Sequence, residues 1–157
     1  GLTRPAGRCE LSTVSTEMTV ILRLDDYWMG RNQSYPNALT PEIVRNATHL
    51  LRKVNGLIAI MHEVNIDIHP TNRSPISSGW RPPEANAATP NSATLSKHMT
   101  GDAVDLFDPD GEMDGWCMDH LDVLSEIGLW MEHPAATKGW SHLQQIPPRS
   151  GRRIFYP

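Results

Sequence analysis

Residues 96–107 have the sequence Ser-Lys-His-Met-Thr-Gly-Asp-Ala-Val-Asp-Leu-Phe, and this stretch decides the fold that we expect. Its second half, residues 103–107, has the alternating pattern of a β-strand. Because successive side chains of a strand point to opposite faces, Asp105 lies on one face, and Val104 and Leu106 lie on the other. The sequence therefore predicts a strand that offers one apolar face to a core and carries a carboxylate in the middle of its second face.

A long amphipathic helix is expected before this strand, from Thr40 to Val64. Thr40 is a favourable N-cap, and Pro41 occupies the first helical position, where proline is well tolerated. Apolar residues then recur at helical spacing, at Ile43, Val44, Ala47, Leu50, Leu51, Val54, Leu57, Ile58 and Met61. We expect this helix to be scaffold and to contribute no functional side chain.

Further strands are expected on both sides of residues 103–107. Residues 75–81, 129–132 and 140–144 each have a short β-favouring pattern, and prolines or glycines interrupt the chain beside them. Helices and strands do not alternate strictly, and the last two strands are separated by a loop of hairpin length. The expected fold class is therefore α+β, with a small, mainly antiparallel sheet packed with helices.

The remaining segments are expected to connect these elements. Residues 84–94 are polar and show neither the helical nor the strand periodicity of apolar residues, which predicts a surface loop. The basic tail from Pro147 onward is predicted to be irregular. A turn at 108–115 leads into a second helix, which ends at Gly128 and has Asp114 or a neighbour as its N-cap.

The length of 157 residues, with 39% apolar and 20% charged residues, predicts one compact domain. Residues 1–17 mix Ser, Thr, Gly and Arg without periodicity and lack the apolar core of a signal peptide. We therefore expect a disordered leader over 1–17 and a single domain over 18–157. No apolar run approaches the ~18 residues that a membrane span requires, so we expect no membrane insertion.

The charge and the cysteines exclude several classes of protein. The formal net charge is −4, from 14 Lys plus Arg against 18 Asp plus Glu, so the chain has no basic surface of the kind that binds nucleic acid. Cys9 and Cys117 are the only cysteines, which excludes a disulfide framework and a Cys-x-x-Cys metal site. Their spacing does not decide whether they pair. We expect the chain to act as a monomer.

Three side chains have the chemistry of a catalytic metal site. His98 lies at the edge of the predicted strand, Asp105 lies within it, and His142 follows 37 residues after Asp105 on another predicted strand. Two neutral imidazoles and one carboxylate suit Zn²⁺, and three protein ligands leave a fourth position for water. Bound zinc acidifies such a water and polarises a carbonyl group.

The pattern around these residues resembles the M15 family of zinc-dependent D,D-carboxypeptidases, dipeptidases and phage L-alanyl-D-glutamate endopeptidases, together with the hedgehog amino-terminal domain. That family has Ser-x-His-x-x-Gly-x-Ala-x-Asp followed by Trp-x-His, which is matched here by Ser96, His98, Gly101, Ala103, Asp105, Trp140 and His142. The sequence Ser-Gly-Trp-Arg at 78–81 resembles the family's Ser-Gly-aromatic-Arg strand. The resemblance covers residues 76–144 and implies a hedgehog/D,D-peptidase fold.

The resemblance implies roles for five residues. His98, Asp105 and His142 would be the zinc ligands. Arg81 would anchor the substrate and polarise the scissile carbonyl group, and Ser96 would help to orient the substrate. For Arg81 the residues themselves add support, because a guanidinium beside two prolines is held rigidly and can form paired hydrogen bonds to a carbonyl or carboxylate.

The sequence departs from the family at the position of the general base. Many members have Glu or Asp three residues before the last histidine, where this chain has Gly139. The nearest acid is Glu132, at the end of the strand expected beside His142, and we predict that Glu132 is the base. His133 is the rival for this role. If neither reaches the metal, the protein would bind zinc without hydrolysing a peptide.

The resemblance implies a zinc-dependent carboxypeptidase or endopeptidase that hydrolyses the stem peptide of bacterial peptidoglycan, in cell-wall lysis or remodelling. Because we expect no signal peptide, such an enzyme would be made in the host cytoplasm and would act on the cell wall during phage lysis or from a virion. Two alternatives stay open. One is a non-catalytic zinc-binding structural or interaction module, which Gly139 favours, and the other is a D-alanyl-D-alanine dipeptidase.

Overall fold

The computed structural model of the protein describes residues 21–68 and 74–157. The expected leader over 1–17 and Cys9 therefore lie outside the described residues. The helical elements are α2 (Leu24–Trp28), α3 (Arg31–Ser34), η1 (Pro36–Ala38), α4 (Pro41–Glu63), α5 (Pro83–Ala88), α6 (Glu112–Asp119), α7 (Leu121–Ile127) and η2 (Pro134–Ala136). The strands are β1 (Ile76–Ser78), β2 (Ala103–Asp108), β3 (Trp130–Glu132), β4 (Gly139–Gln144) and β5 (Ile154–Phe155).

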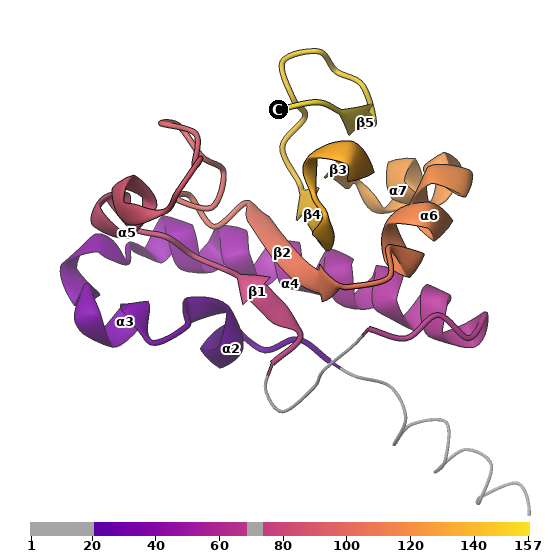
Figure 1. Cartoon of the computed structure of the whole chain (residues 1–157). Coiled ribbons are helices and arrows are strands. Elements are labelled where there is room, and N and C mark those ends of the chain that lie inside the picture. The colour runs from indigo at the N-terminus through magenta and orange to yellow at the C-terminus, as the bar shows by residue number, and fades with distance from the viewer. Residues whose placement is uncertain (1–20, 69–73) are drawn as a thin grey trace, which may run out of the picture.

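The five strands form one sheet in the order β1-β2-β4-β3-β5 (Figure 1). The pairs β1/β2, β2/β4 and β3/β4 are antiparallel, and β3/β5 is parallel. The predicted α+β class and the mainly antiparallel sheet are confirmed. In the part of the chain that the structure describes, no helix is long and apolar enough to cross a bilayer.

Helix α4 is the scaffold of the domain and confirms the prediction for residues 40–64. Its first turn is capped by Thr40, whose Oγ1 accepts a hydrogen bond from the backbone N–H of Ile43 at 3.2 Å. The helix runs behind the sheet in Figure 1. Its buried side chains join the apolar face of the sheet in one core, and the members of both groups are Leu50, Leu51, Val54, Leu57, Ile58, Met61, Val104, Leu106, Met131 and Leu143. The other face of β2 is thereby left for polar side chains.

Two segments predicted to be irregular form regular structure. Residues 83–88 form helix α5 because Pro83 provides a preset first turn and Ala-rich sequence continues it. The tail contains β5, where the backbone N–H of Met131 donates to the carbonyl oxygen of Arg153 at 3.0 Å and the Arg153 guanidinium lies 4.3 Å from the Trp130 ring centroid. Such pairing depends on a distant partner strand, which a local pattern does not reveal.

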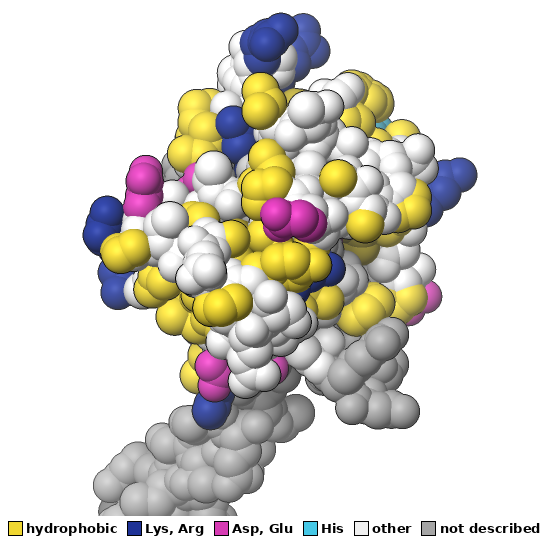
Figure 2. Space-filling view, turned by 90° about the vertical axis from the view of Figure 1, so that its left-hand side faces the viewer, with side chains coloured by type: hydrophobic (Ala, Val, Ile, Leu, Met, Phe, Trp, Pro, Cys, Tyr) yellow, Lys and Arg dark blue, Asp and Glu magenta, His cyan; other side chains and the backbone are white. Residues whose placement is uncertain are grey.

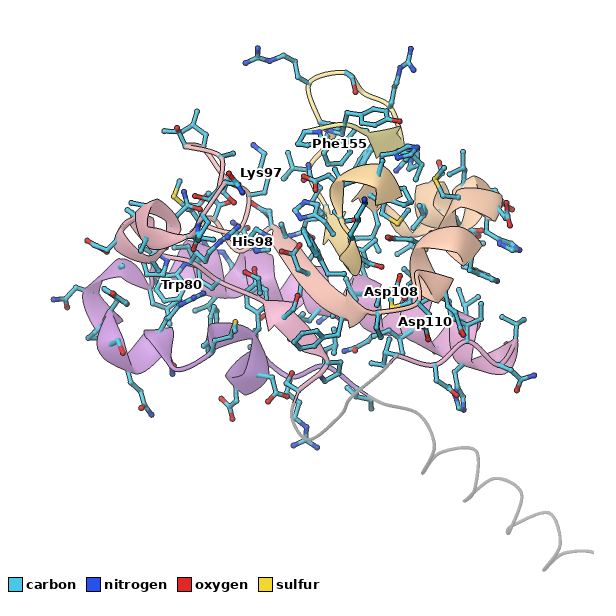
Figure 3. The ribbon with its side chains drawn as sticks, viewed as in Figure 1. Trp80, Lys97, His98, Asp108, Asp110 and Phe155 are labelled. Atoms are coloured by element: carbon cyan, nitrogen blue, oxygen red, sulfur yellow. The ribbon has the colours of Figure 1, made fainter. Side chains whose placement is uncertain are left out.

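The predicted second helix is divided into α6 and α7, with His120 between them. Its N-cap residue is Gly111 and not Asp114, which lies within the first turn. The Asp108 carboxylate accepts hydrogen bonds from the first-turn backbone N–H groups of Met113 (3.1 Å) and Asp114 (3.0 Å). Gly128 ends α7 in a left-handed conformation, as predicted. Figure 3 shows Asp108 and Asp110 at the α6 end of β2, away from His98.

Candidate metal centre

The polar face of the sheet carries a row of side chains that crosses several strands. Asp105 on β2 is paired with Ser78 on β1 and with His142 on β4. Met131 is paired with Leu143, so continuing this antiparallel register by one step places Glu132 opposite His142. Directly opposite residues of a sheet share a face. The row therefore brings together groups that are far apart in the sequence.

His98 completes this row from the loop before β2. Its Nε2 lies 3.3 Å from Oδ2 of Asp105, and Nδ1 of His142 lies 2.8 Å from Oδ1 of the same carboxylate. One ligand atom from each of the three residues lies within 4.8 Å of the others. Ligands at about 2.0 Å around a tetrahedral zinc ion are separated by roughly 3.3 Å, so the donor set has the size that a single ion requires.

Hydrogen bonds fix which ring nitrogen of each histidine carries the proton. Nδ1 of His98 lies 2.9 Å from the carbonyl oxygen of Gly79, so Nδ1 carries the proton and donates it in a hydrogen bond. Nε2 is then unprotonated, or bare, with a free lone pair. Gln144 donates from Nε2 to the carbonyl oxygen of Ile146 at 2.7 Å, which turns its Oε1 toward Nε2 of His142 at 2.8 Å. His142 therefore donates through Nε2 and leaves Nδ1 bare. Both bare nitrogens face Asp105, as in metal sites whose histidines are held from behind.

The electrostatics of this cluster favour a bound cation. Burial raises the pKa of Asp105, but the two imidazoles outweigh burial and hold that pKa far below its usual range. Burial lowers the pKa of His98, although the Asp105 carboxylate opposes it. For His142 burial also lowers the pKa, but the negative charge of Asp105 and the hydrogen bond that its carboxylate accepts from the protonated imidazole outweigh burial, and the pKa is raised. Three electron-pair donors in contact require a proton or a metal ion between them.

Two glycines of the motifs allow this geometry. A side chain on Gly79 would place its Cβ 2.0 Å from the carbonyl oxygen of Tyr27 on α2. Only glycine therefore permits this contact just after β1, at the residue whose carbonyl oxygen holds His98. Gly101 has a φ of +80°, and a Cβ there would lie 2.8 Å from the carbonyl oxygen of Ile43 on α4. The loop that carries His98 is thereby fixed to the scaffold helix.

Arg81 and Ser96 lie beside the ligands. The Arg81 side chain is 8% exposed, and its Nη2 donates to Oγ of Ser96 at 3.3 Å. The same hydroxyl oxygen accepts the backbone N–H of His98 at 3.2 Å. Nε of Arg81 is buried and has no hydrogen-bond partner among the described residues. Ser96 thus connects the arginine to the loop of the first ligand.

The structure separates the two candidates for the base. Burial raises the pKa of Glu132, and the nearby His142 imidazole opposes this shift. His133 instead accepts the backbone N–H of Ala135 through Nδ1 at 3.0 Å and stacks on Tyr156, with 4.5 Å between ring centroids. Gly139 has a φ of +94° and is paired with Asp108. Glu132 is therefore the candidate that shares a surface with a ligand.

That surface is an open groove of about 560 Å³. Glu132, His142 and Gln144 form its floor together with Phe155, whose ring lies edge-on to His142 at 6.2 Å. Its two sides come from the loop before β2 and from the segment around β5. Figure 3 shows this arrangement, with Lys97 and His98 on one side and Phe155 on the other. The side chains of Leu95 and Tyr156 are 81% and 67% exposed at its borders.

A second cavity, of about 620 Å³, lies over α5 and the loop that follows it. Its lining has only uncharged side chains, namely Pro83, Asn86, Ala87, Thr89, Pro90, Asn91, Ser92, Thr94 and Met99. It offers no acid, base or metal ligand, so the candidate site is the groove beside His142.

Sequence reasoning named the three candidate ligands but gave no role to the groups that hold them. Gln144 was detectable, because it shares a strand face with His142 at a spacing of two residues. The carbonyl group of Gly79 and the ring of Phe155 had no such signal, since both approach the site through contacts between distant segments.

No protein-family model, curated protein or solved structure matches the chain. The geometry of the site is therefore the basis for a functional proposal.

Proposed function

We propose that this protein is a zinc-dependent peptidase of the M15 type, with the hedgehog/D,D-peptidase fold, that hydrolyses the stem peptide of bacterial peptidoglycan. The observation that carries the proposal is the convergence of bare Nε2 of His98, bare Nδ1 of His142 and the Asp105 carboxylate beside a groove that also contains Glu132. A site of this kind combines metal ligands, an acid–base group and room for a peptide.

The donor set fits zinc in charge and in chemistry. His98, Asp105 and His142 would hold the ion, and the two neutral imidazoles with one carboxylate leave a site charge of about +1. Bound zinc would supply a Lewis acid that polarises the scissile carbonyl group and acidifies a water molecule. Gly79 and Gln144 would keep the imidazoles oriented, as outer partners of metal ligands do.

Glu132 would act as the general base. It would accept a proton from the attacking water and return that proton to the leaving nitrogen of the peptide bond. Arg81 would stabilise the negative charge that develops on the carbonyl oxygen, an effect often worth ~3 kcal/mol per donor. Its hydrogen bond to Ser96 supports this role, because Ser96 lies on the groove wall and would position the peptide next to the guanidinium.

A polymer substrate is favoured over a free dipeptide by the form of the groove. Its borders at Leu95 and Tyr156 are exposed, so a long peptide could lie along it without being enclosed. This observation supports wall hydrolysis, in phage lysis or from a virion, over a D-alanyl-D-alanine dipeptidase.

The proposal is tested by incubating purified peptidoglycan with the zinc-loaded protein and analysing the products by mass spectrometry. A chelator-treated sample and an Asp105→Ala variant are the controls. We expect zinc-dependent fragments whose new amino terminus or lost terminal alanine identifies the bond. Folded, zinc-bound protein that releases no fragments from walls of several chemical types would instead support a non-catalytic zinc-binding module.

A further inference from the structure

Two basic side chains line the groove, although the chain as a whole is acidic. The formal net charge of the protein is −4, yet the charged side chains on the groove walls are Lys97, Arg149 and Glu132. Across the described residues, no ion pair engages Lys97 or Arg149. Lys97 and Arg149 are therefore cations without a carboxylate partner, whereas the Asp105 carboxylate beside the groove is engaged by His98 and His142.

The backbone of Lys97 is fixed by a hydrogen bond within the loop before β2. Its carbonyl oxygen accepts a hydrogen bond from the backbone N–H of Asp102 at 3.0 Å. The residue lies between Ser96 and His98, both of which are fixed by hydrogen bonds. The half-buried side chain of Lys97 therefore has a defined origin on the wall of the groove, next to the first ligand (Figure 3).

Arg149 comes from a different segment, the loop that joins β4 to β5. A turn shapes this loop, with the backbone N–H of Gly151 donating to the carbonyl oxygen of Pro148 at 2.9 Å. The topmost side chains in Figure 2, which belong to this loop, are basic. Lys97 and Arg149 thus approach the groove from the two segments that border it.

We propose that Lys97 and Arg149 are substrate-binding residues that select peptides with free carboxylates, so that the groove binds anionic stem peptides and discriminates against amidated ones. The inference rests on the proposed function. A carboxylate pairs with lysine as a point charge and with arginine through two parallel hydrogen bonds. A stem peptide offers two such groups, the carboxylate of its D-glutamyl residue and the carboxyl terminus.

The test uses binding, so that it does not depend on turnover. Zinc-loaded protein with Glu132→Gln is titrated by calorimetry with a synthetic stem pentapeptide in three forms: free at both carboxylates, amidated at D-glutamate, or amidated at the carboxyl terminus. The form that binds more weakly than the free peptide identifies the carboxylate that is recognised. Lys97→Met and Arg149→Gln are then compared with Lys138→Met, which removes an exposed lysine that does not line the groove.

We expect Lys97→Met and Arg149→Gln each to weaken binding of the free peptide roughly fivefold, and to have little effect on the peptide amidated at the matching carboxylate. Equal affinity for all three peptides, or an equal loss in Lys138→Met, would overturn the inference. If the unmodified protein hydrolyses peptidoglycan but binds the three peptides with equal affinity, this inference fails and the proposed function stands. Failure of folded protein to bind any of the three would overturn both this inference and the stem-peptide substrate.

Discussion

Gln144 holds His142 because its Oε1 accepts a hydrogen bond from Nε2–H of the imidazole at 2.8 Å, while its own amide nitrogen donates to the Ile146 carbonyl oxygen at 2.7 Å. The amide presents its oxygen to the histidine, because its NH2 group is turned toward the Ile146 carbonyl oxygen. The free lone pair of His142 is consequently on the side of Asp105, where a metal needs it.

Removing this support should weaken metal binding without removing a ligand. We expect Gln144→Leu to lower zinc affinity by roughly 10- to 100-fold, since the imidazole loses its fixed tautomer and orientation. Competition with a chromophoric chelator measures the affinity. Gln33→Leu, at an exposed position on α3, is the control and should bind zinc as the unmodified protein does. Unchanged affinity in Gln144→Leu would show that the hydrogen bond does not orient the ligand.

Zinc should stabilise the folded protein. At a zinc concentration about 1,000 times Kd, binding adds about 4 kcal/mol to the free energy of unfolding, which corresponds to a rise in Tm of roughly 10 °C. His98→Ala, Asp105→Ala and His142→Ala should each abolish this rise in thermal melts. A rise that persists in all three variants would place the metal elsewhere.

Glu132→Gln should separate metal binding from catalysis. The amide cannot accept a proton, so we expect hydrolysis of peptidoglycan to fall roughly 10²- to 10⁴-fold while zinc affinity stays unchanged. His133→Gln is the matched variant and should retain activity, because His133 is engaged with Ala135 and Tyr156. Activity in Glu132→Gln close to that of the unmodified protein would assign the base to another group.

The pH dependence of stability should contain a contribution from Asp114. Burial raises the pKa of Asp114 from 3.8 to about 6, so between these values the folded state binds more protons than the unfolded state. Stability must then fall as pH rises through this window. Asp114→Asn removes the titration, and we expect urea unfolding at pH 4 and pH 7 to show a fall smaller by on the order of 2 kcal/mol than in the unmodified protein. An equal fall in both proteins would contradict this assignment.

Replacing two glycines by alanine should change the stability of the fold in opposite directions, because the two positions differ in environment. Gly101→Ala should destabilise the protein by about 1–3 kcal/mol, because φ is +80° and the new Cβ would lie 2.8 Å from the Ile43 carbonyl oxygen. Gly56→Ala, in the interior of α4 with open space around it, should stabilise by up to about 1 kcal/mol. Denaturant unfolding measures both, and a neutral Gly101→Ala would show that the loop can move away from α4.

The sequence predicted those parts of the protein that local chemistry determines. Thr40 and the apolar spacing after it predicted α4, and the alternation around Asp105 predicted β2 with its polar face. Helix α5 was missed because all but one of its residues are outside the core and give no apolar period. Strand β5 was missed because two residues are too few for a pattern, and its pairing with β3 joins segments more than 20 residues apart. The roles of Glu132 and Arg81 depend on a bound substrate and stay predictions.

The parallel pairing of β5 with β3 leaves Tyr156 and Pro157 on the border of the groove. In Figure 1 the carboxyl end of the chain lies beside β5, above β4. Any polypeptide fused after Pro157 would therefore emerge where a ligand has to enter. An affinity tag at this end, above all a polyhistidine tag that itself binds zinc, would compete for the metal and obstruct the entrance, so the choice of tag would alter the measured affinities.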